Sequence, residues 1–198
     1  MNLPNKLTVL RAVLIPVFLF FMYADFIPFH FTIALFVFVI ASLTDALDGH
    51  IARKHNLVTD FGKFLDPLAD KALVIAALAV FVEKGIMGAV PFIIIIIREF
   101  MVSGLRLVTA DKGVVVAAGF WGKLKTAFTM VAIIFTLVFS AASADFKIFD
   151  IIPGETGENL MFWGFLLIQV LIWISVALTV ISGLVYLKGY WKYIDTDK

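Results

Sequence analysis

Residues 45–70 read DALDGHIARKHNLVTDFGKFLDPLAD and place two pairs of aspartates, Asp45 with Asp48 and Asp66 with Asp70, at the ends of strongly apolar segments. Asp45 and Asp48 are spaced i, i+3, and Asp66 and Asp70 are spaced i, i+4, so each pair lies on one face of a helix. A short connection between the two helices makes them antiparallel neighbours, and the pairs can face each other. An ionised side chain near the middle of a bilayer costs about 2.5–3.5 kcal/mol on insertion scales. Four such residues therefore indicate one shared site.

The composition of the whole chain is that of a membrane protein. Of its 198 residues, 62% are hydrophobic and only 16% are charged, which is far more apolar than a soluble domain. Apolar runs recur at lengths near the ~20 residues that a helix needs to cross a bilayer. We expect an all-α, polytopic membrane protein that forms a single domain over residues 1–198. Its six transmembrane helices are expected at residues 8–23, 29–53, 62–82, 87–109, 121–142 and 160–187.

The distribution of basic residues predicts the orientation. If the N-terminus is cytoplasmic, Lys84 and Lys147 are the basic residues on outer loops, and all other Lys and Arg residues fall at the termini or the inner ends of spans. Because positive charge is retained on the cytoplasmic side, both termini and the aspartate site are expected to face the cytoplasm of a cell membrane. An inner aromatic belt is expected from Tyr186, Tyr190, Trp191 and Tyr193.

The chemistry of the four carboxylates suggests a metal site. Converging carboxylates repel each other in a low dielectric, so either protonation or bound cations must reduce this repulsion. Oxygen ligands without Cys or His favour Mg²⁺ or Mn²⁺, which leave positions for the phosphate oxygens of a substrate. Gly49 and Gly62 have no side chain and would let a substrate or the backbone approach closely, and the guanidinium group of Arg53 would offer a fork of hydrogen-bond donors to phosphate. For any one aspartate taken alone, a proton relay or a transport site is an equal alternative.

The complete arrangement is Asp45-x2-Asp48-Gly49-x2-Ala52-Arg53-x8-Gly62-x3-Asp66-x3-Asp70, and it resembles the signature of the CDP-alcohol phosphotransferases at every fixed position. The resemblance implies that the four aspartates bind two ions of Mg²⁺ or Mn²⁺ and that Asp70 is also the general base. It further implies a homodimer. The residues implied for binding the CDP group are Asp48, Gly49, Ala52, Arg53, Gly62 and Asp66.

Basic residues at 98–126 bear on the acceptor alcohol. Arg106, Lys123 and Lys125 lie near the predicted inner surface, on the side of the aspartates, where a basic cluster suits a phosphorylated alcohol. Their alternative role is to anchor the helices at the membrane surface by snorkelling. Arg98 is deeper and adjoins Glu99, so a structural ion pair competes with ligand contact.

Three further motifs resemble those of bacterial phosphatidylglycerophosphate synthases. They are Pro4-Asn5-Lys6-Leu7-Thr8-x2-Arg11, Arg98-Glu99-x3-Ser103-x2-Arg106 and Gly122-Lys123-x-Lys125-Thr126. This resemblance implies CDP-diacylglycerol as the donor, glycerol 3-phosphate as the acceptor and a bacterial source. It assigns the acceptor phosphate to Arg106, Lys123 and Lys125, with secondary contacts from Arg98 and Ser103, and the entrance of the site to Asn5, Thr8 and Arg11.

Other functions remain open at this stage. Within the same family the acceptor could instead be phosphatidylglycerol or an inositol phosphate. Membrane prenyltransferases also pair aspartates for Mg²⁺ and pyrophosphate, but they generally have more spans and lack the Asp-Gly-x2-Ala-Arg run. A carboxylate-based cation transporter would need inverted-repeat symmetry and a path to the outer face, and the sequence indicates neither. The partners expected are membrane lipid and the two substrates, with no nucleic acid.

Overall fold

The computed structural model describes the backbone of residues 3–55, 60–111, 119–152 and 154–191, and the side chains of residues 9–44, 71–109, 119–152 and 154–191. Within these ranges every regular element is a helix, which confirms the all-α prediction. The elements are α1 (Leu3–Tyr23), α2 (His30–His55), α3 (Asp60–Glu83), α4 (Ala89–Asp111), α5 (Phe120–Ser140), the π-helical turn η1 (Ala141–Asp145), α6 (Ile148–Ile151) and α7 (Glu155–Tyr190). The long helices coincide with the expected spans to within a few residues at each end.

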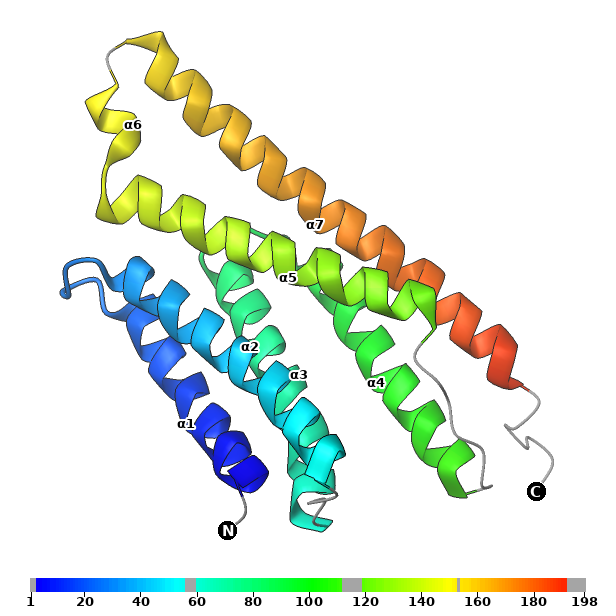
Figure 1. Cartoon of the computed structure of the whole chain (residues 1–198). Coiled ribbons are helices and arrows are strands. Elements are labelled where there is room, and N and C mark those ends of the chain that lie inside the picture. Colours follow the sequence, from blue (N-terminus) through cyan, green and yellow to red (C-terminus); the bar gives the residue numbers. More distant parts are fainter. Residues whose placement is uncertain (1–2, 56–59, 112–118, 153, 192–198) are drawn as a thin grey trace.

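The long helices run alternately up and down the molecule (Figure 1). As a result, α1 begins and α7 ends at the same end of the molecule, which we call the terminal end. The turns that join α1 to α2 and α3 to α4 lie at the opposite end, together with α6. Helix α1 packs against α2 and α3, whereas α7 packs against α4 and α5, and α2 also contacts α5. The second half of the chain is thereby joined to the first.

The interior is apolar and closely packed. Phe18 of α1 and Phe38 of α2 are fully buried, with ring centroids 5.7 Å apart and planes tilted by 55°. Ala34, Ala41 and Ala77 are also fully buried. Small side chains at such positions let helix backbones approach each other closely, as is common in membrane bundles.

Two of the described helices are long and apolar enough to cross a membrane. The first is α5 continued by η1, Phe120–Asp145, with a mean hydropathy of 2.1, and the second is α7, with a mean hydropathy of 2.5. At 1.5 Å per residue, the 36 residues of α7 extend over about 54 Å, whereas the hydrocarbon core is about 30 Å thick. Helix α7 is therefore longer than the hydrocarbon core is thick. It begins at Glu155, before the expected start of the span at residue 160.

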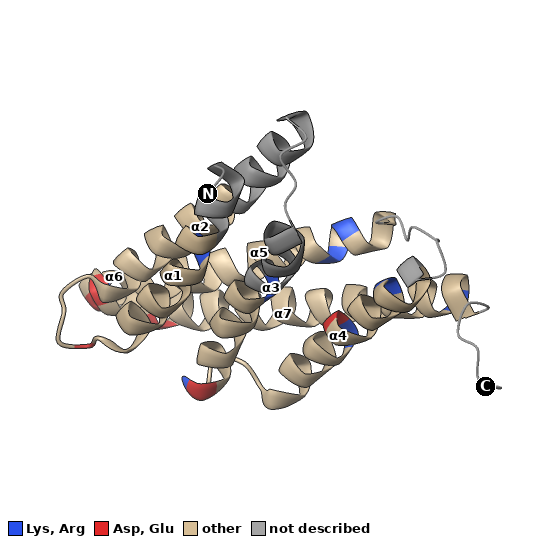
Figure 2. Ribbon diagram, turned by 90° about the horizontal axis from the view of Figure 1, so that it is seen from below, with Lys and Arg blue, Asp and Glu red and all other residues tan. Residues whose placement is uncertain are grey.

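Charge is divided between the two ends (Figure 2). Among the residues with described side chains, Glu99 is the one acidic residue away from the opposite end. The acidic residues at the opposite end are Asp25, Glu83, Asp145, Asp150, Glu155 and Glu158. Basic side chains instead concentrate on α3, α4, α5 and α7 toward the terminal end.

Candidate functional site

The signature motif lies on the two helices that the sequence predicts. Asp45, Asp48, Gly49, Ala52 and Arg53 are in α2, and Gly62, Asp66 and Asp70 are in α3. Their side chains lie outside the described residues, as do those of Asn5 and Thr8 in α1. The part of the chain with described side chains contains no group of three or more acidic or histidine residues that could hold a metal ion. Metal binding by the four aspartates stays a prediction.

Residues from two of the acceptor motifs meet in one open cleft between α3, α4, α5 and α7, which we call the basic cleft. Its volume is about 520 Å³. The charged and hydroxyl side chains that line it are Lys71, Arg98, Glu99, Ser103, Arg106, Lys123, Thr126 and Tyr186. The structure thus brings Arg98, Ser103, Arg106 and Lys123 together, as the sequence analysis expected, and adds Lys71.

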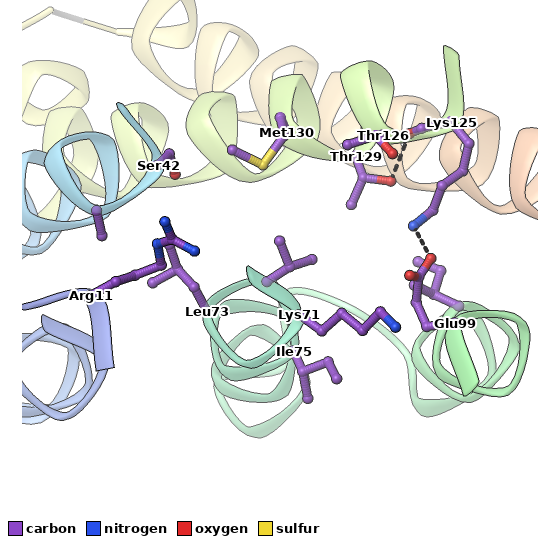
Figure 3. A pocket seen from close by; sticks show the side chains of 13 residues that line it. Arg11, Ser42, Lys71, Leu73, Ile75, Glu99, Lys125, Thr126, Thr129 and Met130 are labelled. Atoms are coloured by element: carbon purple, nitrogen blue, oxygen red, sulfur yellow. Dashed lines mark hydrogen bonds and ion pairs between the residues drawn. The ribbon is translucent and has the colours of Figure 1, made fainter. Parts of the chain in front are cut away.

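A smaller pocket of about 150 Å³ lies beside the basic cleft (Figure 3). Arg11 reaches into it from α1, Ser42 borders it from α2, and Lys125 lines it from α5. We call it the deep pocket. Lys71 and Glu99 line both spaces, so the deep pocket and the basic cleft adjoin at these two residues. Arg11 is fully buried, so its side chain forms part of an interior wall, and its assigned role at the entrance stays a prediction.

Glu99 connects two of the basic residues. Its Oε1 atom accepts a hydrogen bond from Nη1 of Arg98 at 3.1 Å and another from Nζ of Lys125. The side chains of Lys125 and Glu99 are only 5% and 17% exposed, so their attraction is weakly screened by water. The ion-pair alternative for Arg98 is therefore present in the structure. The sequence analysis treated Glu99 only as a neighbour of Arg98 and missed its contact with Lys125.

Lys71 is a second residue that the sequence analysis missed. Its Nζ atom donates a hydrogen bond to Oγ of Ser103, and this hydroxyl in turn donates to the backbone oxygen of Glu99 at 2.6 Å. Lys71 thus ties α3 to α4 at the junction of the two spaces. The signal available in the sequence was its position directly after Asp70, the last residue of the signature.

Tyr186 corrects one prediction. We expected it in an aromatic belt at the membrane surface, but it is only 5% exposed and lines the basic cleft. The belt prediction is therefore wrong for Tyr186, although Trp191 at the end of α7 is 58% exposed. A signal was present, since Ser182 and Tyr186 are polar groups spaced i, i+4 in a largely apolar helix and so share one face.

Comparison with known proteins identifies the family. The sequence pattern described as CDP-alcohol phosphatidyltransferase matches residues 1–181. A Bacillus subtilis (strain 168) protein named CDP-diacylglycerol–glycerol-3-phosphate 3-phosphatidyltransferase is 41% identical, over 99% of this chain and 98% of its own length. Proteins of the same name from Rickettsia bellii (strain RML369-C) and Pseudomonas fluorescens are 38% and 36% identical, covering 97% and 100% of this chain and 97% and 94% of their own lengths. This chain belongs to the CDP-alcohol phosphatidyltransferase family.

Proposed function

We propose that this protein transfers the phosphatidyl group of CDP-diacylglycerol to glycerol 3-phosphate, giving phosphatidylglycerophosphate and CMP. Relatives that align with nearly the whole chain carry the name of this activity. The observation in the structure that carries the proposal is the basic cleft, which adjoins a helix of the signature at Lys71. A phosphorylated acceptor would bind there, beside the residues expected to hold the CDP group.

The charge of the basic cleft suits a phosphate monoester. Lys71, Arg98, Arg106 and Lys123 line it, and Glu99 is the one carboxylate among its described lining residues. Arginine presents a planar fork of donors that matches phosphate oxygens, whereas lysine offers a compact charge. The volume of about 520 Å³ lies in the range of roughly 300–1,000 Å³ that is usual for small-molecule sites.

Residues that flank the signature in the sequence line the deep pocket. Ser42 lies three residues before Asp45 in α2, and Lys71 lies directly after Asp70 in α3. This arrangement supports a donor pyrophosphate near the deep pocket and an acceptor phosphate in the adjoining basic cleft.

The donor set of the signature fits a divalent metal, because four carboxylates offer only hard oxygen ligands. Asp45, Asp48, Asp66 and Asp70 would hold Mg²⁺ or Mn²⁺, and a bound pair would supply positive charge against the pyrophosphate. Gly49, Ala52, Arg53 and Gly62 complete the CDP-binding set.

The remaining chemistry belongs to the protein side chains. Asp70 accepts the proton of the acceptor hydroxyl, whose oxygen then bonds to the phosphorus that carries diacylglycerol. The bond from this phosphorus to the bridging oxygen breaks, and CMP leaves with that oxygen. Arg106 and Lys123 hold the acceptor phosphate in the basic cleft, so that the hydroxyl is oriented toward the phosphorus. Lys125, the third residue assigned to this phosphate, lines the adjoining deep pocket and would add its charge from that side.

The proposed setting is a cell membrane that all six long helices cross, with the terminal end in the cytoplasm. The support is that, among the residues with described side chains, the basic ones gather toward the terminal end, since basic residues are retained on the cytoplasmic side. Attaching a membrane-impermeant label to single cysteines at Lys84 and Lys188 of the cysteine-free chain tests this orientation. Labelling of intact cells is expected at Lys84 only. A homodimer is proposed from the family resemblance and is tested by cross-linking in membranes.

An acceptor panel tests the function. The full-length protein in detergent receives labelled CDP-diacylglycerol, Mg²⁺ or Mn²⁺, and one of glycerol 3-phosphate, phosphatidylglycerol, inositol phosphate or glycerol. Lipid product and CMP are expected with glycerol 3-phosphate, and chelation of the metal is expected to stop the reaction. Product with another alcohol but none with glycerol 3-phosphate would overturn the acceptor assignment. Failure to release CMP with any alcohol would instead contradict the transferase activity and favour the cation-transporter alternative.

A further inference from the structure

Tyr186 lies where two arginines of the basic cleft meet α7. The guanidinium carbon of Arg98 is 5.5 Å from the centroid of the Tyr186 ring, and that of Arg106 is 5.9 Å from the same centroid. Both distances fall within the ~6 Å over which a cation is attracted to an aromatic face. Arg98 and Arg106 are two turns apart on α4, so one ring contacts both cations of the motif.

The surroundings hold the ring itself in place. The Tyr186 hydroxyl accepts a hydrogen bond from the backbone N–H of Gly119 at 3.0 Å, just before α5 begins. One turn earlier on α7, Ser182 Oγ accepts from Nη2 of Arg98 at 2.5 Å. A Cβ atom on Gly122 would come within 3.2 Å of the Tyr186 hydroxyl oxygen, so a residue without a side chain lets α5 approach the ring.

Two arginine side chains in a partly buried cleft repel each other, and each can adopt several rotamers unless neighbouring groups hold it in one of them. The Arg98 side chain is 11% exposed, and the Nε atom of its guanidinium group has no hydrogen-bond partner among the residues that the structure describes. Glu99 and Ser182 bind only the two terminal nitrogens of this group. The face of the Tyr186 ring therefore restrains the Arg98 guanidinium group in addition to these hydrogen bonds. The same ring also restrains Arg106.

We propose that Tyr186 is a positioning residue that holds Arg98 and Arg106 in the orientation that receives the phosphate of the acceptor. It thereby contributes to the selection of phosphorylated over neutral alcohols. The inference deepens the proposed function and rests on it. Tyr186 lies beyond residue 181, where the match to the family pattern ends, so this role belongs to the last turns of α7.

The test compares Tyr186→Leu with Tyr186→Phe in the full-length protein. The Leu variant loses the aromatic face, and its KM for glycerol 3-phosphate is expected to rise roughly three- to thirtyfold, the equivalent of about 0.7–2 kcal/mol. Its kcat and its KM for CDP-diacylglycerol are expected to stay within about twofold of wild type. The Phe variant keeps the face and loses only the hydroxyl, so its acceptor KM should stay within about threefold of wild type.

Calorimetric titration of the same proteins with inorganic phosphate separates this inference from the function on which it rests. Phosphate binding depends on the basic cleft and not on which alcohol carries the phosphate, so weaker binding by Tyr186→Leu supports the positioning role whatever the acceptor panel gives. An unchanged phosphate Kd in the folded Leu variant would overturn it.

A purely structural role predicts a different result, namely equal losses for donor and acceptor together with a lower unfolding temperature. That result would also overturn the proposal. Trp173→Leu is the matched control, because Trp173 is 53% exposed on the same helix and about 20 Å from Tyr186 along its axis. If Tyr186→Leu does not fold, Tyr186→Met supplies the same comparison, since it fills the space without an aromatic face.

Discussion

The two ends of the bundle use charge differently. At the opposite end, two carboxylates accept hydrogen bonds from a neighbouring helix. Oδ2 of Asp145 in η1 accepts from both the backbone N–H and the hydroxyl of Thr32 in α2, at 2.6 and 2.7 Å. Glu83 in α3 likewise accepts from the hydroxyl of Tyr23 in α1. These bonds join elements that are distant in the sequence, so the charge at this end serves the fold.

At the terminal end the described charges are out of balance. Lys71, Arg98, Arg106 and Lys123 line the basic cleft, and Glu99 is the one described carboxylate among them. Gathering four cations around one described carboxylate costs free energy, and a bound anion would offset that cost. The comparison therefore predicts that changes at the terminal end affect activity first and that changes at the opposite end affect stability first.

The largest expected effects come from substitutions of the signature aspartates, which test whether the terminal end carries the activity. Asp45→Ala and Asp66→Ala are expected to abolish both metal binding, measured by Mn²⁺ electron paramagnetic resonance, and CMP release. Asp70→Asn keeps a metal-binding oxygen but not the base, so its kcat is expected to fall roughly 100- to 10,000-fold, while donor binding changes much less. Equal loss of donor binding in all three variants would contradict the assignment of Asp70 as the base.

Next in size is a pair of matched charge removals, one at each end. Arg106→Gln removes a charged donor from the basic cleft, and the acceptor KM is expected to rise about 10- to 100-fold, because hydrogen bonds to charged groups contribute roughly 1.5–3 kcal/mol. Lys84→Gln removes a cation that lies over the Tyr23 and Phe31 rings at the opposite end. Its kinetic constants should stay at wild-type values. Steady-state kinetics with both substrates checks the pair, and equal effects on acceptor KM would break the comparison.

The sequence predicted the helices well because their signals are local. Apolar runs near the length of a membrane span and charged or Pro-Gly breaks need no knowledge of neighbours, and the expected span at 29–53 agrees with α2 at His30–His55. The expected start of the last span, at residue 160, was less accurate. Helix α7 starts at Glu155, after a glycine with φ of +71°, because a helix can extend into polar sequence beyond the apolar run.

Motifs predicted the basic cluster, whereas residues placed by tertiary contacts alone were missed. Arg106, Lys123 and Lys125 were placed in one cluster from their motifs, with Arg98 as a weaker member, and the structure brings Arg98, Arg106 and Lys123 together in the basic cleft. Lys71 and Tyr186 were not, because their roles depend on how α3 and α7 pack against α4. A tyrosine near a helix end predicts a membrane surface on average, and only the packing of α7 reveals that Tyr186 points inward.

A smaller effect is expected at Glu99, the carboxylate that balances the cations. Glu99→Gln keeps a hydrogen-bond acceptor for Lys125 and Arg98 but removes the negative charge that faces them in a buried setting, so the free energy of unfolding should fall by roughly 1–3 kcal/mol. Added inorganic phosphate should restore more stability to this variant than to wild type, as an anion then takes over the balance. Thermal unfolding in detergent with and without phosphate checks this. Equal phosphate effects in both proteins would show that Glu99 does not compete with an anion for these cations.

The smallest effect is expected at the opposite end, from Asp145→Asn. The amide oxygen can still accept from Thr32, but the bonds lose their charge assistance, so the free energy of unfolding should fall by about 1 kcal/mol. Both KM values and kcat should be unchanged, since η1 is remote from the basic cleft (Figure 1). Asp150→Asn is the matched control, because Asp150 in α6 is exposed and its carboxylate has no hydrogen bond within the described part of the chain. A fall in kcat for Asp145→Asn would mean that the two ends are coupled through α2 and α5, and the division of labour between them would then be wrong.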